Sequence, residues 1–115
     1  MKRLIADLST GIIQQTPEAM HAAALKLDLR LPGCSSLKEK RRRLRPMLDH
    51  LRRRMELSAS EVDHHDAWQR AGVGIAVVAP QAGRLDEIVE RIRRWALDLD
   101  EVELVTFDIG HVEMP

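Results

Sequence analysis

Residues 23–39 read "AALKLDLRLPGCSSLKE" and contain a predicted strand, a turn and the start of a helix. Apolar residues occupy every second position from 23 to 31, and charged residues stand at most of the positions between them. This period of two is typical of a strand that buries one face against a core. Pro32 and Gly33 follow directly and end the strand, because neither residue favours continued pairing.

A helix is predicted to begin at Leu37. Ser36 and Glu39 have the spacing of a capping box, in which each side chain bonds a free backbone N–H of the other residue. One apolar stripe then continues at helical spacing: Leu37, Leu44, Leu48, Leu51 and Met55. Pro46 interrupts this segment, because proline lacks a backbone N–H and clashes with the preceding turn. We therefore expect a kink at residues 42–46 or a split of the helix there.

Four further elements follow along the chain. Residues 58–65, "SASEVDHH", are short and polar and predict an edge strand. Residues 72–79, "GVGIAVVA", alternate large and small side chains and predict a central strand. A second amphipathic helix is predicted from apolar residues at helical spacing between 85 and 99. A last strand is predicted at residues 102–109, with one face formed by Val105, Phe107 and Ile109.

The order of these elements is β-α-β-β-α-β, which predicts an α+β ferredoxin-like sandwich. In this fold an antiparallel four-stranded sheet carries two helices on one face. Right-handed crossovers place the first and third strands in the centre and the second and fourth at the edges.

Length and composition favour one soluble globular domain. The chain has 115 residues, of which 44% are hydrophobic and 31% charged. Residues 1–19 show no reliable periodicity and are expected to be a flexible arm, whereas residues 20–115 form the single domain. Polar residues interrupt the start of the chain, so no signal peptide or membrane partner is expected. Cys34 is the only cysteine, which fits a reduced, cytoplasmic location.

A basic segment is the most prominent candidate for a binding surface. Nine Lys and Arg stand between Cys34 and Met55 against two acidic residues, whereas residues 56–115 carry five Arg against thirteen Asp and Glu. Such asymmetry points to a nucleic-acid partner. The candidate nucleic-acid-binding residues are Lys38, Arg41, Arg42, Arg45, Arg52 and Arg53. A solvated helix face and a site for an acidic protein are the alternatives.

Other site chemistries have weaker support in the sequence. In an extended strand, Asp63 and His65 share one face while His64 and Asp66 share the other, so each face offers a metal only two ligands. Cys34 has no base at a recognisable spacing. We therefore predict no catalytic residues, no metal site and no cofactor.

Small and aromatic residues on the predicted sheet and its loops suggest packing more than ligand binding. Gly72 and Gly74 on a central strand allow something to pack closely, such as a second subunit. Trp68 and Trp95 are expected to be packing or interface residues. Base stacking on the sheet is not expected, because Phe107 shares a face with core residues and the chain has no tyrosine.

The chain resembles the YlxP-like family of small bacterial proteins of unknown function. The resemblance runs from about residue 22 to 109 and is carried by "SLKEKR" at 36–41, "EVD" at 61–63 and "WQRA" at 68–71. It implies a ferredoxin-like domain and no established activity. Genes of this family often stand beside those for translation initiation and ribosome-binding factors, which implies a link to RNA or the ribosome. The N-terminal arm, Cys34 and Pro46 depart from the usual pattern.

From these observations we expect a non-enzymatic, cytoplasmic accessory factor that contacts RNA or a ribosomal particle through its first helix. The alternative is a homo-oligomeric scaffold, such as a homodimer, or a small-ligand-binding module that uses the open sheet face.

Overall fold

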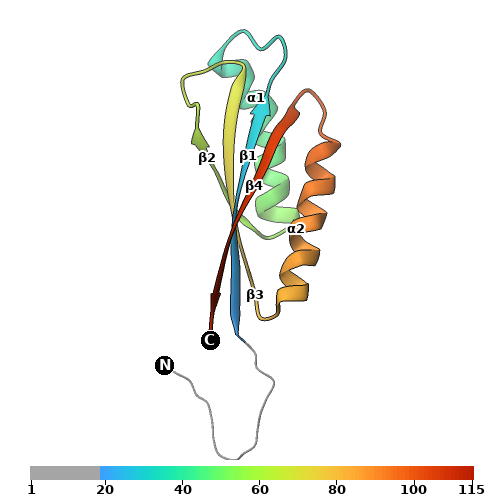
Figure 1. The fold of residues 1–115 in the computed structure, drawn as a ribbon. Coiled ribbons are helices and arrows are strands. Elements are labelled where there is room, and N and C mark those ends of the chain that lie inside the picture. The colour runs from blue at the N-terminus through green and yellow to red at the C-terminus, as the bar shows by residue number, and fades with distance from the viewer. Residues whose placement is uncertain (1–18) are drawn as a thin grey trace, which may run out of the picture.

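The computed structural model describes residues 19–115, so the predicted arm lies outside the described residues except for Ala19. Figure 1 shows one twisted sheet with two helices on the same side of it. The elements are β1 (Met20–Arg30), α1 (Leu37–Asp49), the π-helix η1 (His50–Arg54), β2 (Ser58–Asp63), β3 (Arg70–Ala79), α2 (Ala82–Leu97) and β4 (Glu103–Met114).

The sheet has the strand order β2-β3-β1-β4, and every neighbouring pair is antiparallel. β1 and β3 are therefore central, as predicted, and the α+β ferredoxin-like class is confirmed. No helix within residues 19–115 combines the length and the apolar character needed to span a membrane.

The core lies between the sheet and the two helices. On β1, Leu25, Leu27 and Leu29 are buried, which confirms the alternation in the sequence. Leu25 lies opposite Ile75 of β3 on one side and Ile109 of β4 on the other. The helices cover this face with side chains that recur at helical spacing: Leu44 and Met47 of α1, Leu51 of η1, and Leu85, Val89, Ile92 and Ala96 of α2.

The predicted capping box at the start of α1 has two hydrogen bonds, and the structure contains one of them. The backbone N–H of Glu39 donates to Ser36 Oγ at 3.0 Å. The return bond differs, because Glu39 Oε1 accepts from the backbone N–H of Ser35 at 3.3 Å and not from that of Ser36. The cap still gives partners to two N–H groups at the helix start.

The helix is not split at Pro46, and the change of helical type comes later. α1 continues through Pro46 to Asp49, and η1 follows with π geometry. The backbone N–H of Met55 donates to His50 O at 3.0 Å, five residues earlier. Buried Leu44 and Met47 flank Pro46 on both sides, so packing against the sheet holds the two turns in one helix despite the lost hydrogen bond.

The predicted face of the last strand is wrong for Val105. Asp28 pairs with Thr106, but the next residue, Leu29, pairs with Leu104, so Val105 is skipped in a β-bulge. Val105 is 51% exposed. The extra residue shifts the alternation by one position, which places Leu104 against the core where the simple pattern would place Val105.

The two glycines of β3 make room for this chain's own edge strand. A second register shift lies between Glu61 and Asp63 of β2. A Cβ on Gly72 would lie 2.6 Å from Asp63 Cβ, and one on Gly74 would lie 3.0 Å from Val62 Cγ1. The sequence suggested that the two glycines allow close packing, for instance by a second subunit. In the structure, β2 of the same chain packs closely against them.

Candidate nucleic-acid interface

All six basic residues predicted to bind nucleic acid are exposed. Because α1 and η1 turn Leu44, Met47 and Leu51 toward the sheet, the basic side chains lie on the flanks and outer side of the helix.

Four of the six line one hollow between the α1–η1 segment and the edge strand β2. This hollow has a volume of about 470 Å³, and we call it the arginine groove. Its basic residues are Arg41, Arg45, Arg52 and Arg53. Leu44 and Leu48 supply apolar surface, and the acidic lining residues are Asp49 and Glu61. The structure thus brings together residues that are twelve positions apart in the sequence.

A second hollow of about 640 Å³ lies on the opposite side of the Arg41–Arg45 row. Its lining includes the other two predicted residues, Lys38 and Arg42, together with Glu39. Arg41 and Arg45 line both hollows, so they form a ridge between them.

Glu101, from the C-terminal half, neutralises the side of the basic helix that carries Arg42 and Arg43. Arg42 pairs with Glu101 at 3.0 Å, and Arg43 lies 3.6 Å from the same carboxylate. Arg43 is also held by the backbone, because it donates to Pro32 O and Glu101 O. Of the six predicted residues, five have no acidic group within 4.0 Å among residues 19–115: Lys38, Arg41, Arg45, Arg52 and Arg53.

Lys40 belongs to the basic run in the sequence but not to the basic surface. Its side chain is 2% exposed, and Nζ lies 2.9 Å from Glu61 Oε2. Lys40 Nζ also donates to His64 O at 2.7 Å and to Ala67 O at 2.8 Å. The residue therefore ties α1 to the loop after β2. Its helical spacing of four from Leu44 is the signal that sequence reasoning missed.

Arg52 is a candidate that also has a structural contact. Its Nε donates to Ala59 O on β2 at 2.9 Å. This bond fixes the side chain against the wall of the arginine groove. Its two terminal guanidinium nitrogens make no hydrogen bond to a side chain or ion-pair contact within residues 19–115, so they can donate to a ligand.

The sequence prediction placed Asp63 and His64 on opposite faces of an extended strand, and this is wrong. The strand ends at Asp63, and His64 has a φ of +60°, so the alternation stops there. His64 Nε2 lies 3.5 Å from Asp28 Oδ1 and 3.8 Å from Asp63 Oδ2, which places Asp63 and His64 on the same side of the sheet. His65 turns away to Glu61 O at 3.2 Å. Residues 19–115 contain no group of three or more such side chains arranged to hold a metal.

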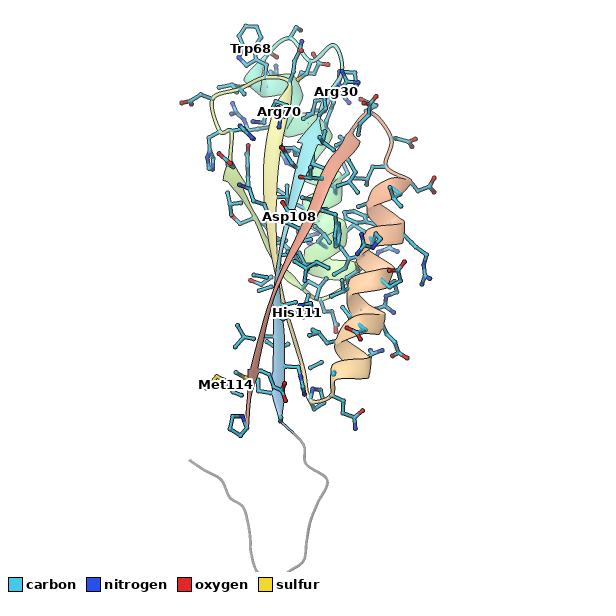
Figure 2. The ribbon with its side chains drawn as sticks, in the orientation of Figure 1. Arg30, Trp68, Arg70, Asp108, His111 and Met114 are labelled. Atoms are coloured by element: carbon cyan, nitrogen blue, oxygen red, sulfur yellow. The ribbon has the colours of Figure 1, made fainter. Side chains whose placement is uncertain are left out.

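Charged side chains cover one end of the open sheet face. Figure 2 shows Arg30 and Arg70 near this end and Asp108 nearer the middle of the sheet. Lys26 Nζ donates to Asp63 Oδ2 at 2.8 Å, and Arg70 pairs with Asp28. The hydrogen bond from Lys26, supported by the backbone N–H of His64, lowers the pKa of Asp63 below its ordinary value. The same bond to Asp63 raises the pKa of Lys26.

Replacing Lys26 with methionine is expected to raise the pKa of Asp63 toward its ordinary value. Some lowering should remain, because the His64 N–H still donates to Asp63 Oδ1 at 2.8 Å. In the native protein the Asp63 contribution to stability is present above the unfolded-state pKa of aspartate and is lost as pH falls through the lower folded value. NMR titration of the Asp63 carboxyl carbon measures the pKa of Asp63 in each variant. Lys38→Met is the matched control, and equal Asp63 pKa values in both variants would contradict the assignment.

Cys34 is buried, and its thiol contacts Ser36 O at 3.5 Å. Gln69 Nε2 donates to the backbone oxygen of the same residue at 3.3 Å. Cys34 therefore packs at the junction between the β1–α1 connection and the loop that precedes β3.

Comparison with known proteins identifies the family of this chain. The profile of a family described as a protein of unknown function (DUF503) matches residues 22–109. The "Uncharacterized protein YlxP" of Bacillus subtilis (strain 168) is 32% identical over 68 residues, which are 59% of this chain and 74% of that protein. The family match covers most of the chain and includes nearly all of β1, both α-helices, β2, β3 and the larger part of β4. The chain therefore belongs to the DUF503 family of YlxP-like proteins.

Proposed function

We propose that this domain is a non-enzymatic accessory factor that contacts RNA, free or within a ribosomal particle, through the arginine groove. One observation carries the proposal. Four arginines surround a single hollow, and none of the four has an acidic group within 4.0 Å among residues 19–115: Arg41, Arg45, Arg52 and Arg53. Planar guanidinium groups bind two phosphate oxygens at once, which suits them to a nucleic-acid backbone.

The groove favours contact with phosphates over recognition of sequence. Its polar lining consists mainly of arginine, and Glu61 is already paired with Lys40. Arg52 is held in place by Ala59 O, so less side-chain entropy is lost when it binds. We therefore expect affinity that depends strongly on salt and weakly on base sequence.

An acidic protein segment fits this groove less well. A peptide that extended the sheet would pair with the free edge of β2. The Arg52 guanidinium already occupies the acceptor at Ala59 O on this strand. A phosphate backbone needs no strand pairing and uses only the arginines, so RNA is the better partner.

A homodimer through the open sheet face is the second candidate function. Ala22 of β1 pairs with Val78 on one side and Val112 on the other, and both valines are more than half exposed. This apolar row lies away from the charged end of the face. It does not involve the arginine groove, so substitutions in the groove distinguish the two functions.

Changing Arg41, Arg45 and Arg53 together to glutamine is expected to weaken the salt dependence of RNA binding. With about four phosphates neutralised, log affinity for a single strand should fall with log salt at a slope near −3, and the triple variant should flatten the slope by about 2. Fluorescence anisotropy of a labelled single-stranded 12-mer at several salt concentrations measures both slopes.

The matched control removes the same charge from α2, with Arg84, Arg91 and Arg94 changed to glutamine. Arg93 is left intact, because its guanidinium lies 4.5 Å from the centre of the Phe107 ring. Equal flattening in the control, or no salt-dependent binding by the wild type at low ionic strength, would refute the proposed site.

A further inference from the structure

The chain has two tryptophans and one phenylalanine. Among the described residues, Trp95 and Phe107 each stack with an aromatic or cationic side chain, and Trp68 does not. It lies in the loop between β2 and β3 and is 51% exposed. Trp95 is stacked on His50, with ring centres 5.1 Å apart, and Phe107 is covered by Arg93. Figure 2 shows Trp68 at the end of the molecule where α1 begins. A half-exposed indole offers both an apolar face and an N–H donor to a ligand.

The backbone on both sides of Trp68 is fixed. Before it, Ala67 O accepts from buried Lys40, and Ala67 N–H donates to His64 O at 3.0 Å. After it, Gln69 O accepts from the backbone N–H of Leu31 at 2.9 Å, and the Gln69 side chain donates to Cys34 O. Binding at the ring therefore loses little loop entropy, because the loop is already ordered.

The Trp68 loop and the arginine groove share one structural support. Lys40 holds the loop carbonyls and pairs with Glu61, and Glu61 is also a lining residue of the groove. Arg41 follows Lys40 directly in α1 and opens into the same groove. Ala67, which Lys40 bonds, directly precedes Trp68, and Arg41 directly follows Lys40, so one side chain connects the Trp68 loop to the helix turn that carries Arg41.

We propose that Trp68 is a stacking platform for an unpaired nucleobase, so that the ligand of the groove is single-stranded RNA. This inference rests on the proposed function and adds its substrate class. Bases stack on aromatic rings with little sequence preference, and the neighbouring arginines hold the backbone. A duplex keeps its bases paired and stacked on one another, apart from the outer faces of its end pairs, so it offers Trp68 no unpaired base.

The first test is a fluorescence titration of the Trp95→Phe variant, in which Trp68 is the only tryptophan. A single-stranded uridine 12-mer should quench its emission on binding, and a blunt RNA duplex of 12 base pairs should not. Quenching of equal size by both RNAs, or binding of the single strand without quenching, would overturn the platform.

The second test compares affinities after changing Trp68 itself. Trp68→Ala should weaken single-strand binding by about 10- to 100-fold and leave the salt slope unchanged, because stacking moves no counterions. Trp68→Phe should retain most of the affinity, and duplex binding should be equal in all three proteins. Thermal unfolding of each variant checks that the exposed ring is not needed for folding.

The outcomes separate the platform from the groove. If Trp68→Ala binds the single strand as tightly as the wild type, while the triple arginine variant still flattens the slope, the platform is wrong and the proposed function stands. If neither RNA binds the wild type, the proposed function fails and the platform fails with it. In that case a protein becomes the alternative partner for the exposed Trp68 ring.

Discussion

Replacing Lys40 with methionine is expected to lower the free energy of unfolding by about 3 kcal/mol, because it removes one partner of a mostly buried ion pair. The change leaves Glu61 without its cation and removes the donor to His64 O and Ala67 O. Methionine keeps the apolar stem of the side chain, so the loss reports mainly on the polar contacts. Urea unfolding followed by circular dichroism measures the change.

Lys38→Met is the control for Lys40, because it changes the same charge two residues away on the exposed side of α1. Its effect should be within about 0.5 kcal/mol. A loss below about 1 kcal/mol for Lys40→Met, or equal losses for both variants, would show that the buried contacts add little to stability. The Lys40 variant should also exchange its amide protons faster in the loop at residues 64–69, since the loop loses its anchor to α1.

Replacing Gly72 with alanine is expected to destabilise the protein by about 1–3 kcal/mol through overpacking. The added Cβ would lie 2.6 Å from Asp63 Cβ and 3.4 Å from the Asp63 backbone, so β2 must move as a strand. That movement would also disturb the ion pair between Asp63 and Lys26. Thermal and urea unfolding both measure the loss.

Gly110→Ala is the matched control, because Gly110 also lies on the sheet and a Cβ there meets no atom within 4 Å. We expect it to be neutral or slightly stabilising, since alanine restricts the unfolded chain more than glycine does. Equal free energies of unfolding for Gly72→Ala and Gly110→Ala would show that the close packing of β2 on β3 does not require glycine at position 72.

The order and type of the main elements were predictable because their signals are local. The alternation of leucines in β1 specifies a buried face at Leu25, Leu27 and Leu29, whatever lies opposite. Ser36 specifies the start of α1, because its cap bond spans only three residues. The β-α-β-β-α-β order then leaves one common topology, in which β1 and β3 are central.

The bulges were not predictable from the same patterns. Val105 has the spacing of a core residue, and only the pairing of β4 with β1 shows that it is skipped. Val62 of β2 is likewise left between the paired residues Glu61 and Asp63. A register shift depends on how two distant strands fit together, so neither strand shows it alone.

The basic segment has some properties that the sequence predicts and others that depend on the folded chain. The dense cluster of positive charge on α1 and η1 is evident from the sequence, because it depends only on composition and helical period. Which of these charges are available to a ligand depends on the folded chain. It buries Lys40 against Glu61, pairs Arg42 with Glu101, and leaves Arg41 and Arg45 open to solvent. The physical reason is that ion pairing and burial depend on residues far apart in the chain, whereas periodicity depends on near neighbours.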